Sequence, residues 1–283
     1  MNSVPGTQLG RAAAQNQRDA QNVLGYCYAE GVGVRKNSKT ACKWFRRAMQ
    51  GGHEVAAYNL GICYFQGKGV RKNRRLAANC FFEAASRGDS DAQFNLALCL
   101  ETGLGLRKNV ADAREWYRKA AGQGDSDAQY NLALLHAAGL GGKRSYSTAF
   151  RWFMMAAQQG DGDAQFSVAL CYAMGQGVRK NSRKAILWYR KAAQSGNAAA
   201  QCNLGVAIFH GDAVPSNRRR AYELYTLAAR QGHVHAQFNL ALCYECGEGI
   251  AKNLYQARKW YRAAAKQGHA GARHKLRFLS SVP

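Results

Sequence analysis

The chain has 283 residues, of which 40 are Lys or Arg and 17 are Asp or Glu, so its formal net charge is +23. No stretch approaches the roughly 20 apolar residues that a helix needs to span a bilayer, and the three prolines suit long helical stretches. We therefore expect a soluble intracellular protein, most simply a cytoplasmic one, without a transmembrane segment.

The opening of the chain, residues 1–15, is expected to be a flexible segment. It contains no apolar run of seven or more residues, which excludes a secretory signal peptide. Only Arg11 and Arg18 are basic before the first acidic residue, Asp19, and two basic residues are too few for a mitochondrial presequence. We therefore expect no leader that would direct the chain out of the cytoplasm.

From residue 16 onward the sequence repeats with a period of 36 residues, which indicates a solenoid. One glycine closes each unit, at Gly52, Gly88, Gly124, Gly160, Gly196, Gly232 and Gly268. We expect seven repeats, at 16–52, 53–88, 89–124, 125–160, 161–196, 197–232 and 233–268, followed by a C-terminal capping half-repeat at 269–283.

Each unit is predicted to form two helices. In the unit 89–124, Ala92, Leu96 and Cys99 follow the spacing of one helix face, and the Gly-rich loop after them ends that first helix. Asn109 is expected to cap a second helix. Because such a hairpin is too thin to bury its own apolar face, neighbouring units must stack and share one core.

The helix ends carry residue types that satisfy free backbone N–H groups. Asp89 or Asp91 can cap the first helix of the third unit, and His53, His233 and His269 stand at the Asp89 position in other units. The asparagines at the starts of the second helices are Asn37, Asn73, Asn109, Asn181, Asn217 and Asn253.

Five units share a tryptophan in the second helix, which we expect to pack in the core. These residues are Trp44, Trp116, Trp152, Trp188 and Trp260.

The recurring pattern AQxNLGxxYxxGxGVxxN…AxxWYxKAAxQG resembles the Sel-one-like repeat (SLR) family, which is related to the tetratricopeptide repeats. The resemblance implies an all-α fold, a right-handed superhelical α-solenoid of helix–turn–helix repeats whose first helices line the concave face. It also implies a role in protein–protein interaction. The chain departs from the family pattern at Cys80 and Leu224, where tryptophan is usual, and at Ala213 and Pro215 in the loop of the sixth unit.

The nine cysteines favour a reducing compartment. Five of them occupy one position of the first helix, at Cys27, Cys63, Cys99, Cys171 and Cys243. Leu135 and Ala207 fill that position in other units, which indicates a small buried apolar residue. Cys243 and Cys246 have the CxxC spacing of redox and zinc sites, but coincidence is the better interpretation, because a thioredoxin-type motif needs a strand–helix context.

Part of the positive charge is organised in the loops between the two helices of each unit. We call this set the basic stripe; it comprises Arg35, Lys36, Arg71, Lys72, Arg107, Lys108, Lys143, Arg144, Arg179 and Lys180. Because the pairs recur at the repeat period, stacking is expected to align them along one edge of the solenoid.

One polar position recurs in the first helix. We call these residues the asparagine ladder: Asn59, Asn95, Asn131, Asn203 and Asn239. Two interpretations remain open. The side-chain amides could hydrogen-bond an extended peptide on the concave face, or they could bind a neighbouring unit's backbone and fix the stacking.

Catalysis is not indicated by any residue pattern. The seven histidines recur without the Ser, Cys or Asp partners of a catalytic triad, and no second ligand pair accompanies Cys243 and Cys246. We therefore expect no catalytic residue, no metal and no cofactor.

The favoured functional hypothesis is a monomeric protein–protein interaction scaffold or adaptor that binds a peptide or a partner domain on its concave face. An acidic protein partner would also account for the net charge. The alternative is sequence-independent RNA binding through the basic stripe, since Lys and Arg clusters supply phosphate affinity. The nearly constant ladder argues against reading RNA base by base.

Overall fold

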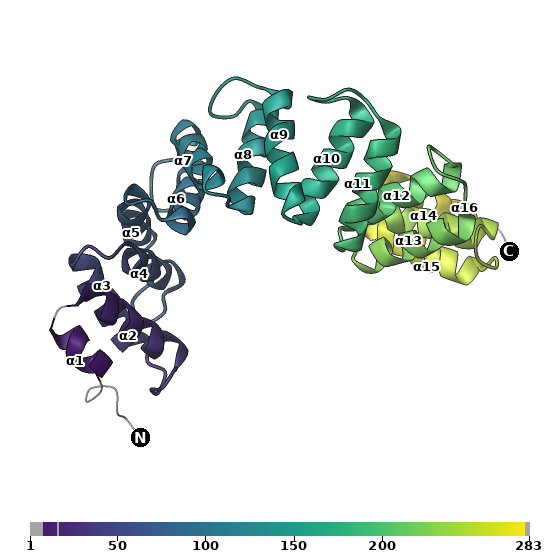
Figure 1. The fold of residues 1–283 in the computed structure, drawn as a ribbon. Coiled ribbons are helices and arrows are strands. Elements are labelled where there is room, and N and C mark those ends of the chain that lie inside the picture. Colours follow the sequence, from purple (N-terminus) through teal and green to yellow (C-terminus); the bar gives the residue numbers. More distant parts are fainter. Residues whose placement is uncertain (1–7, 16, 281–283) are drawn as a thin grey trace. The chain divides into compact units, whose positions relative to one another are not determined.

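The computed structural model describes residues 8–15 and 17–280, and these residues form sixteen helices and no strand (Figure 1). They divide into two compact units, with the boundary between Arg144 and Ser145. Within each unit, successive helices pack against one another as helix–turn–helix repeats. The predicted all-α solenoid organisation is confirmed.

The first unit contains α1 (Gln8–Ala14), α2 (Arg18–Glu30), α3 (Ser38–Gln50), α4 (Glu54–Gln66), α5 (Arg74–Ser86), α6 (Ser90–Thr102), α7 (Val110–Gly122) and α8 (Ser126–Ala138). The second unit contains α9 (Tyr146–Gln158), α10 (Gly162–Met174), α11 (Ser182–Gln194), α12 (Ala198–His210), α13 (Arg218–Arg230), α14 (Val234–Cys246), α15 (Leu254–Lys266) and α16 (Ala270–Ser280). From α2 to α15, the even-numbered helices are the first helices of their repeats and the odd-numbered helices are the second helices.

The second helices begin at the predicted asparagine caps. The Oδ1 atom of Asn37 accepts a hydrogen bond of 3.1 Å from the Thr40 N–H. The five other asparagines make the same bond to the residue three positions on, and Ser145 does so in the fourth repeat. The cap satisfies a backbone donor that the first turn leaves free, so it fixes where each second helix starts.

The first helices from α4 to α14 are capped by Asp, Asn or His, whereas Gln17 before α2 makes no side-chain cap bond. In the third repeat the cap is Asp89, whose Oδ1 accepts a bond of 2.7 Å from the Ala92 N–H. Asp91 lies inside the helix. The Nδ1 atoms of His53, His233 and His269 accept the equivalent bond, which confirms their predicted capping role.

The loop between the helices requires left-handed backbone at two positions. The second of these approaches the preceding second helix closely: a Cβ on Gly69, whose φ is +73°, would lie 2.2 Å from the Ser38 carbonyl oxygen. In the sixth repeat this position is Ala213, with φ of 59°, and it is the one non-glycine residue with positive φ in the described part of the chain. Because an L-residue is disfavoured in this region, Ala213 is strained.

The core aromatic of each repeat is the residue that follows the tryptophan position. These seven residues are buried: Phe45, Phe81, Tyr117, Phe153, Tyr189, Tyr225 and Tyr261. Tyr117 and Tyr261 are fully enclosed, at 0% exposure. The tryptophans are only half-buried, so their expected place in the core needs correction.

Three of the half-buried tryptophans have a basic side chain of the same helix over the ring. The Lys119 Nζ lies 3.7 Å from the ring centre of Trp116, and Lys191 lies 4.3 Å from Trp188. Arg47 takes the same place over Trp44. Such cation–π contacts are made at the protein surface, which agrees with the partial exposure of these rings.

The N-terminal segment contains more order than the expected flexible lead at 1–15. Residues 8–14 form α1, which packs against α2 and buries Ala13. The Gln21 side chain donates a hydrogen bond of 3.0 Å to the Ala13 carbonyl and ties the two helices together. Residues 1–7 of that segment lie outside the described residues, as do residues 281–283 of the predicted C-terminal half-repeat.

Candidate functional site in the grooves between first helices

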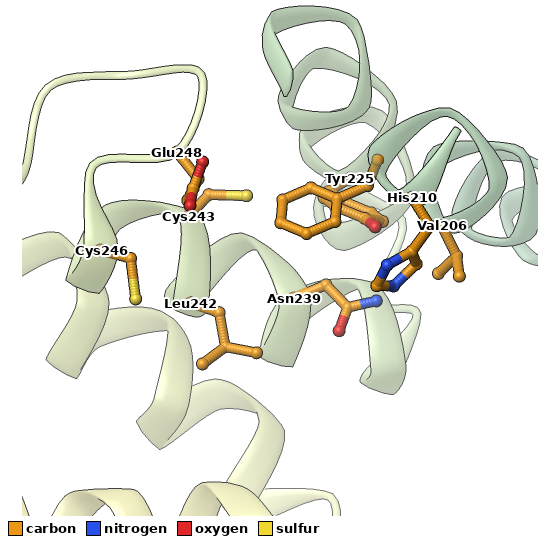
Figure 2. A pocket seen from close by; sticks show the side chains of 9 residues that line it. Val206, His210, Tyr225, Asn239, Leu242, Cys243, Cys246 and Glu248 are labelled. Atoms are coloured by element: carbon orange, nitrogen blue, oxygen red, sulfur yellow. The ribbon is translucent and has the colours of Figure 1, made fainter. Parts of the chain in front are cut away.

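Neighbouring first helices enclose a pocket of about 270 Å³ in the second unit, between α12 and α14 (Figure 2). The buried ring of Tyr225, from α13, contributes to it. Figure 2 shows His210 and Asn239 turned toward the same space from the two first helices. The lining residues are Val206, Phe209, His210, Tyr225, Asn239, Leu242, Cys243, Cys246 and Glu248.

A pocket of about 300 Å³ lies in the first unit, between α2 and α4. Its residues include Tyr26, Ala29, Glu30, Phe45, Asn59, Ile62, Cys63, Gln66 and Lys68. Each of these stands 180 residues, or five repeat periods, before a residue that lines the pocket in the second unit. The pocket is therefore a recurring product of the repeat, and we call each occurrence an inter-repeat groove.

The groove combines constant and variable side chains. An asparagine of the ladder and a buried aromatic ring occupy the same places in both units. The rim varies: Glu30 and Lys68 in one groove correspond to His210 and Glu248 in the other. A constant polar centre with a changing rim can hold a common backbone while the side chains beside it are distinguished.

The ladder asparagines are half-buried and make internal hydrogen bonds through their amide nitrogens. The Nδ2 of Asn59 donates to the Asn22 Oδ1 over 3.3 Å, and that of Asn203 donates to the Tyr189 hydroxyl over 3.4 Å. The Nδ2 of Asn95 donates to the Asp91 carbonyl of its own helix over 2.8 Å.

The side-chain oxygens of the ladder have no such partner. Among the described residues, no protein donor reaches the Oδ1 of Asn59, Asn95, Asn131, Asn203 or Asn239. The bonds of Asn59, Asn203 and Asn239 join neighbouring helices, that of Asn95 stays within its own helix, and the side-chain oxygens remain as acceptors at the groove.

Two of the buried tyrosines donate to glutamates of the preceding first helix. The Tyr117 hydroxyl donates to the Glu101 Oε2 over 2.8 Å, and Tyr261 makes the same bond to Glu245. Burial, and then the adjacent carboxylate, raise the pKa of both tyrosines above the ordinary value. Both hydroxyls therefore stay protonated and act as donors.

A row of buried glutamines, which the sequence interpretation missed, joins successive repeats. The Gln93 Nε2 donates to the Ala85 carbonyl of the preceding repeat over 3.2 Å, and its Oε1 accepts from Gln123 of its own repeat over 2.9 Å. Gln237 does the same with Ala229 and Gln267. Glutamine stands directly after the position of Ala92 in six repeats, so the signal was present in the sequence. These bonds satisfy helix-end carbonyls and fix the stacking.

All ten residues of the basic stripe are exposed. They lie in the loops, whereas the ladder lies on the first helices, so the structure assigns the two predicted sets to different elements. One residue joins them: Lys36 lines the groove of the first unit, where its Nζ lies 3.7 Å from the Glu30 carboxylate.

Charge is unevenly divided between the two kinds of helix. The second helices α3, α11 and α15 each carry four basic residues and no acidic one. Arg18 is the single Lys or Arg in the first helices α2 to α14. Their acidic residues are Asp19, Glu30, Glu54, Asp91, Glu101, Asp127, Asp163 and Glu245. The first helices are thus poor in positive charge, although Lys36 and Lys68 from the loops reach the rim of the groove in the first unit.

The nine cysteines are free thiols. Cys243 is buried, which raises its pKa to about 12, and Cys246 is exposed at the end of α14. Figure 2 shows their sulfur atoms pointing in different directions. Within the described part of the chain, no three His, Cys, Asp or Glu residues gather as metal ligands, and none of its helices has the length and apolar character needed to cross a membrane.

Two solved structures are similar to the chain over almost its whole length. One is c5321, described as a protective antigen of uropathogenic Escherichia coli with an SLR fold, at 33% identity and a TM-score of 0.90. The match covers 95% of this chain and 58% of that one, so the chain spans less than two thirds of it. The other is a Sel1 repeat protein from Oxalobacter formigenes, at 32% identity and a TM-score of 0.79, covering 96% and 78%. No curated protein matches the chain.

The Sel1 repeat model matches seven times in tandem, at residues 18–53, 55–89, 90–125, 126–161, 162–197, 198–233 and 234–269. These matches cover most of the chain and follow the helix pairs described above. The chain belongs to the Sel1 repeat family.

Proposed function

We propose that the chain is a protein–protein interaction scaffold that binds an extended segment of a partner along its inter-repeat grooves, with no catalysis of its own. Sel1 repeat proteins are generally protein-interaction scaffolds. The observation that supports the proposal for this chain is the recurrence of one groove, with an asparagine at its centre, at an interval of five repeats.

The ladder oxygens give the groove its chemistry. An extended peptide presents backbone N–H groups that need acceptors, and each ladder Oδ1 is an acceptor without a protein donor in the described residues. The half-buried position strengthens such bonds, because water competes less well there than at an open surface. Such hydrogen bonds recognise the peptide backbone and not its side chains, so the specificity for a partner sequence must come from the variable rim.

The proposal is tested with peptides selected on the full chain from a randomised dodecapeptide phage library. We expect the double variant Asn95→Ala and Asn131→Ala to bind the selected peptides at least about tenfold more weakly than the wild type, since two hydrogen bonds at about 1 kcal/mol each are lost. The matched control is Arg71→Ala with Arg107→Ala, two loop positions whose equivalent Arg35 does not line the described groove, and it should change affinity less than about twofold. Equal losses in both variants, or none in the ladder variant, would reject the grooves as the binding face.

A second candidate function is sequence-independent RNA binding. The observation in its favour is the exposure of the complete basic stripe beside second helices that are themselves basic. Exposed Lys and Arg side chains can bind phosphate groups without a pocket or groove. RNA binding would use the loops and second helices, and peptide binding would use the grooves. The two candidate functions therefore predict that different substitutions weaken binding.

A further inference from the structure

In two repeats the position of the groove residues Ala29 and Phe209 holds a glutamate, whose carboxylate accepts a hydrogen bond from a buried tyrosine hydroxyl. The two pairs are Glu101–Tyr117 and Glu245–Tyr261, which lie 144 residues, or four repeat periods, apart. The other repeats place Ala29, Phe65, Ala137, Ala173 and Phe209 at the glutamate position. The carboxylate is therefore a local addition to a general groove.

The C-terminal pair is completed by a cation from the chain itself. In α16, Lys275 stands 36 residues after Asn239, at the ladder position. Its Nζ lies 2.9 Å from the Glu245 Oε1, and the two side chains are only 36% and 20% exposed. Burial acts to raise the pKa of Glu245, but the hydrogen bonds from Tyr261 and Lys275 bring it below the ordinary value. The chain thus fills this groove with its own ammonium group.

The corresponding site in the first unit lacks that cation. Its ladder residue is Asn131, and no Lys or Arg of the described chain forms an ion pair with Glu101. Glu101 is half-buried and accepts one bond, from Tyr117, so most of its acceptor capacity is unused. A partly desolvated carboxylate without a counterion is costly, and a cation that reached it would relieve that cost.

We propose that Glu101 binds the side-chain ammonium of a lysine on the partner protein, in the place that Lys275 takes over Glu245. This rests on the proposed scaffold function and adds the chemistry of one partner residue. The Asn131 Oδ1 offers a second acceptor to the three N–H groups of an ammonium. Leu134, which is 41% exposed, stands at the groove position of Leu242 and offers apolar surface to the lysine methylene groups.

The net charge of +23 does not oppose this contact at short range. The charges of the stripe are exposed, and salt screens them beyond about 8 Å at physiological ionic strength. The first helices α6 and α8 carry the acidic residues Asp91, Glu101 and Asp127 and no Lys or Arg, and the half-buried Arg114 of α7 contacts His136 of α8. A lysine that enters this groove therefore meets a negative local field.

The test uses the selected dodecapeptides described above and the full chain at physiological salt. We expect the groove-dependent peptides to contain a lysine, and Glu101→Gln to weaken them at least about tenfold, as expected when a charge-assisted hydrogen bond is lost. Replacing that lysine of the peptide by norleucine should weaken binding to the wild-type protein by the same factor. The same replacement should hardly change binding to the Glu101→Gln variant. This non-additivity identifies the two groups as partners.

Two further variants separate binding from folding. Asn131→Lys supplies an internal ammonium beside Glu101, as Lys275 does beside Glu245, so it should block the peptides while the thermal unfolding midpoint is kept. Glu115→Gln removes a carboxylate from an exposed position of α7, outside the grooves, and should leave affinity unchanged.

Each outcome bears on a different claim. The inference is overturned if the selected peptides lack lysine, or if they bind Glu101→Gln with full affinity. The scaffold function still stands in that case, provided that the peptides depend on the asparagine ladder. Peptides that ignore the ladder, or a library that yields no binder, count against the scaffold function and the inference together.

Discussion

Tyr117 is fully enclosed, whereas its neighbour Trp116 keeps one edge at the surface beside Lys119. Tyr117→Ala should therefore lower the free energy of unfolding by about 3–5 kcal/mol, as for truncation of a buried aromatic residue. Trp116→Ala should cost roughly 1–3 kcal/mol. Denaturant melts of both variants measure the difference, with Lys108→Ala as an exposed control below about 0.5 kcal/mol. A larger loss for Trp116→Ala would mean that the core aromatic was assigned wrongly.

A second residue-scale prediction concerns the strained loop of the sixth repeat. Ala213→Gly should raise the free energy of unfolding by up to about 1 kcal/mol. The strain of alanine in left-handed backbone is larger than the extra chain entropy that glycine loses on folding. The reverse change at the equivalent position, Gly69→Ala, should be destabilising by more than that, since its Cβ would meet the Ser38 carbonyl. Thermal melts of this pair should shift in opposite directions, and shifts of the same sign would contradict the assigned strain.

The distinction between Tyr117 and Trp116 also shows where prediction from sequence ends. Both aromatics recur at the repeat period, and adjacent positions on a helix point only about 100° apart. Which one faces the core depends on how the helix is rotated against its neighbours. The Glu101–Tyr117 bond was unpredictable for the same reason, since it joins two helices whose relative rotation the sequence does not state.

Helix boundaries, in contrast, were largely predictable, because they depend on local chemistry. The asparagine caps at Asn37 and its equivalents, and the glycines after each first helix, act within a few residues of where they stand. The same boundary residues occur in successive repeats, which made each helix boundary easier to predict. The segment at 8–14 has no repeated counterpart, and its helix was missed.

The helices α14 and α16 begin at histidine caps. Burial, and then the charge of His235, lower the pKa of His233 and His269 below 6.5. The unfolded chain therefore binds protons more readily than the folded chain, and protonation of Nδ1 also removes the acceptor of the cap. The stabilisation is complete above about pH 6.5 and is lost as the pH falls below that value.

Replacing both residues with Asn tests this cap, because Asn is an equally good cap that does not titrate in this range. Between pH 7 and pH 5 the wild type should lose more stability than the double variant His233→Asn and His269→Asn, by an amount on the order of the 1 kcal/mol that one helix cap contributes. Denaturant midpoints at the two pH values provide the measurement, and His210→Asn, which is not a cap, serves as the control. A wild type and a double variant with parallel pH profiles would show that the caps do not titrate.

Across the whole molecule, the division of charge separates two modes of association. The first helices present grooves with acidic residues and free amide oxygens, and the loops and second helices present positive charge. A partner in the grooves depends on a few fixed atoms, so its affinity should respond to single substitutions. An anion on the basic surface is held by many exposed charges, each of small effect, so its affinity should respond mainly to salt.

The last prediction applies this difference to RNA. We expect the chain to bind single-stranded RNA weakly, with log affinity falling as log salt concentration rises. Four Gln substitutions in the basic stripe should reduce that slope by up to about 3, since each contacted phosphate of a single strand contributes about 0.7. The residues are Arg71, Lys72, Arg107 and Lys108.

A matched variant places four Gln substitutions on second helices, at Lys39, Lys43, Arg118 and Lys119. Both variants lose the same charge from exposed positions and should unfold within about 0.5 kcal/mol of the wild type. Fluorescence anisotropy over a series of salt concentrations then compares the slopes. An equal reduction in both would mean that the positive surface as a whole, and not the stripe, holds RNA. Because a groove partner depends mainly on the first helices, RNA should not displace it. An RNA that competes away every groove-bound peptide at physiological salt would leave nucleic-acid binding as the function.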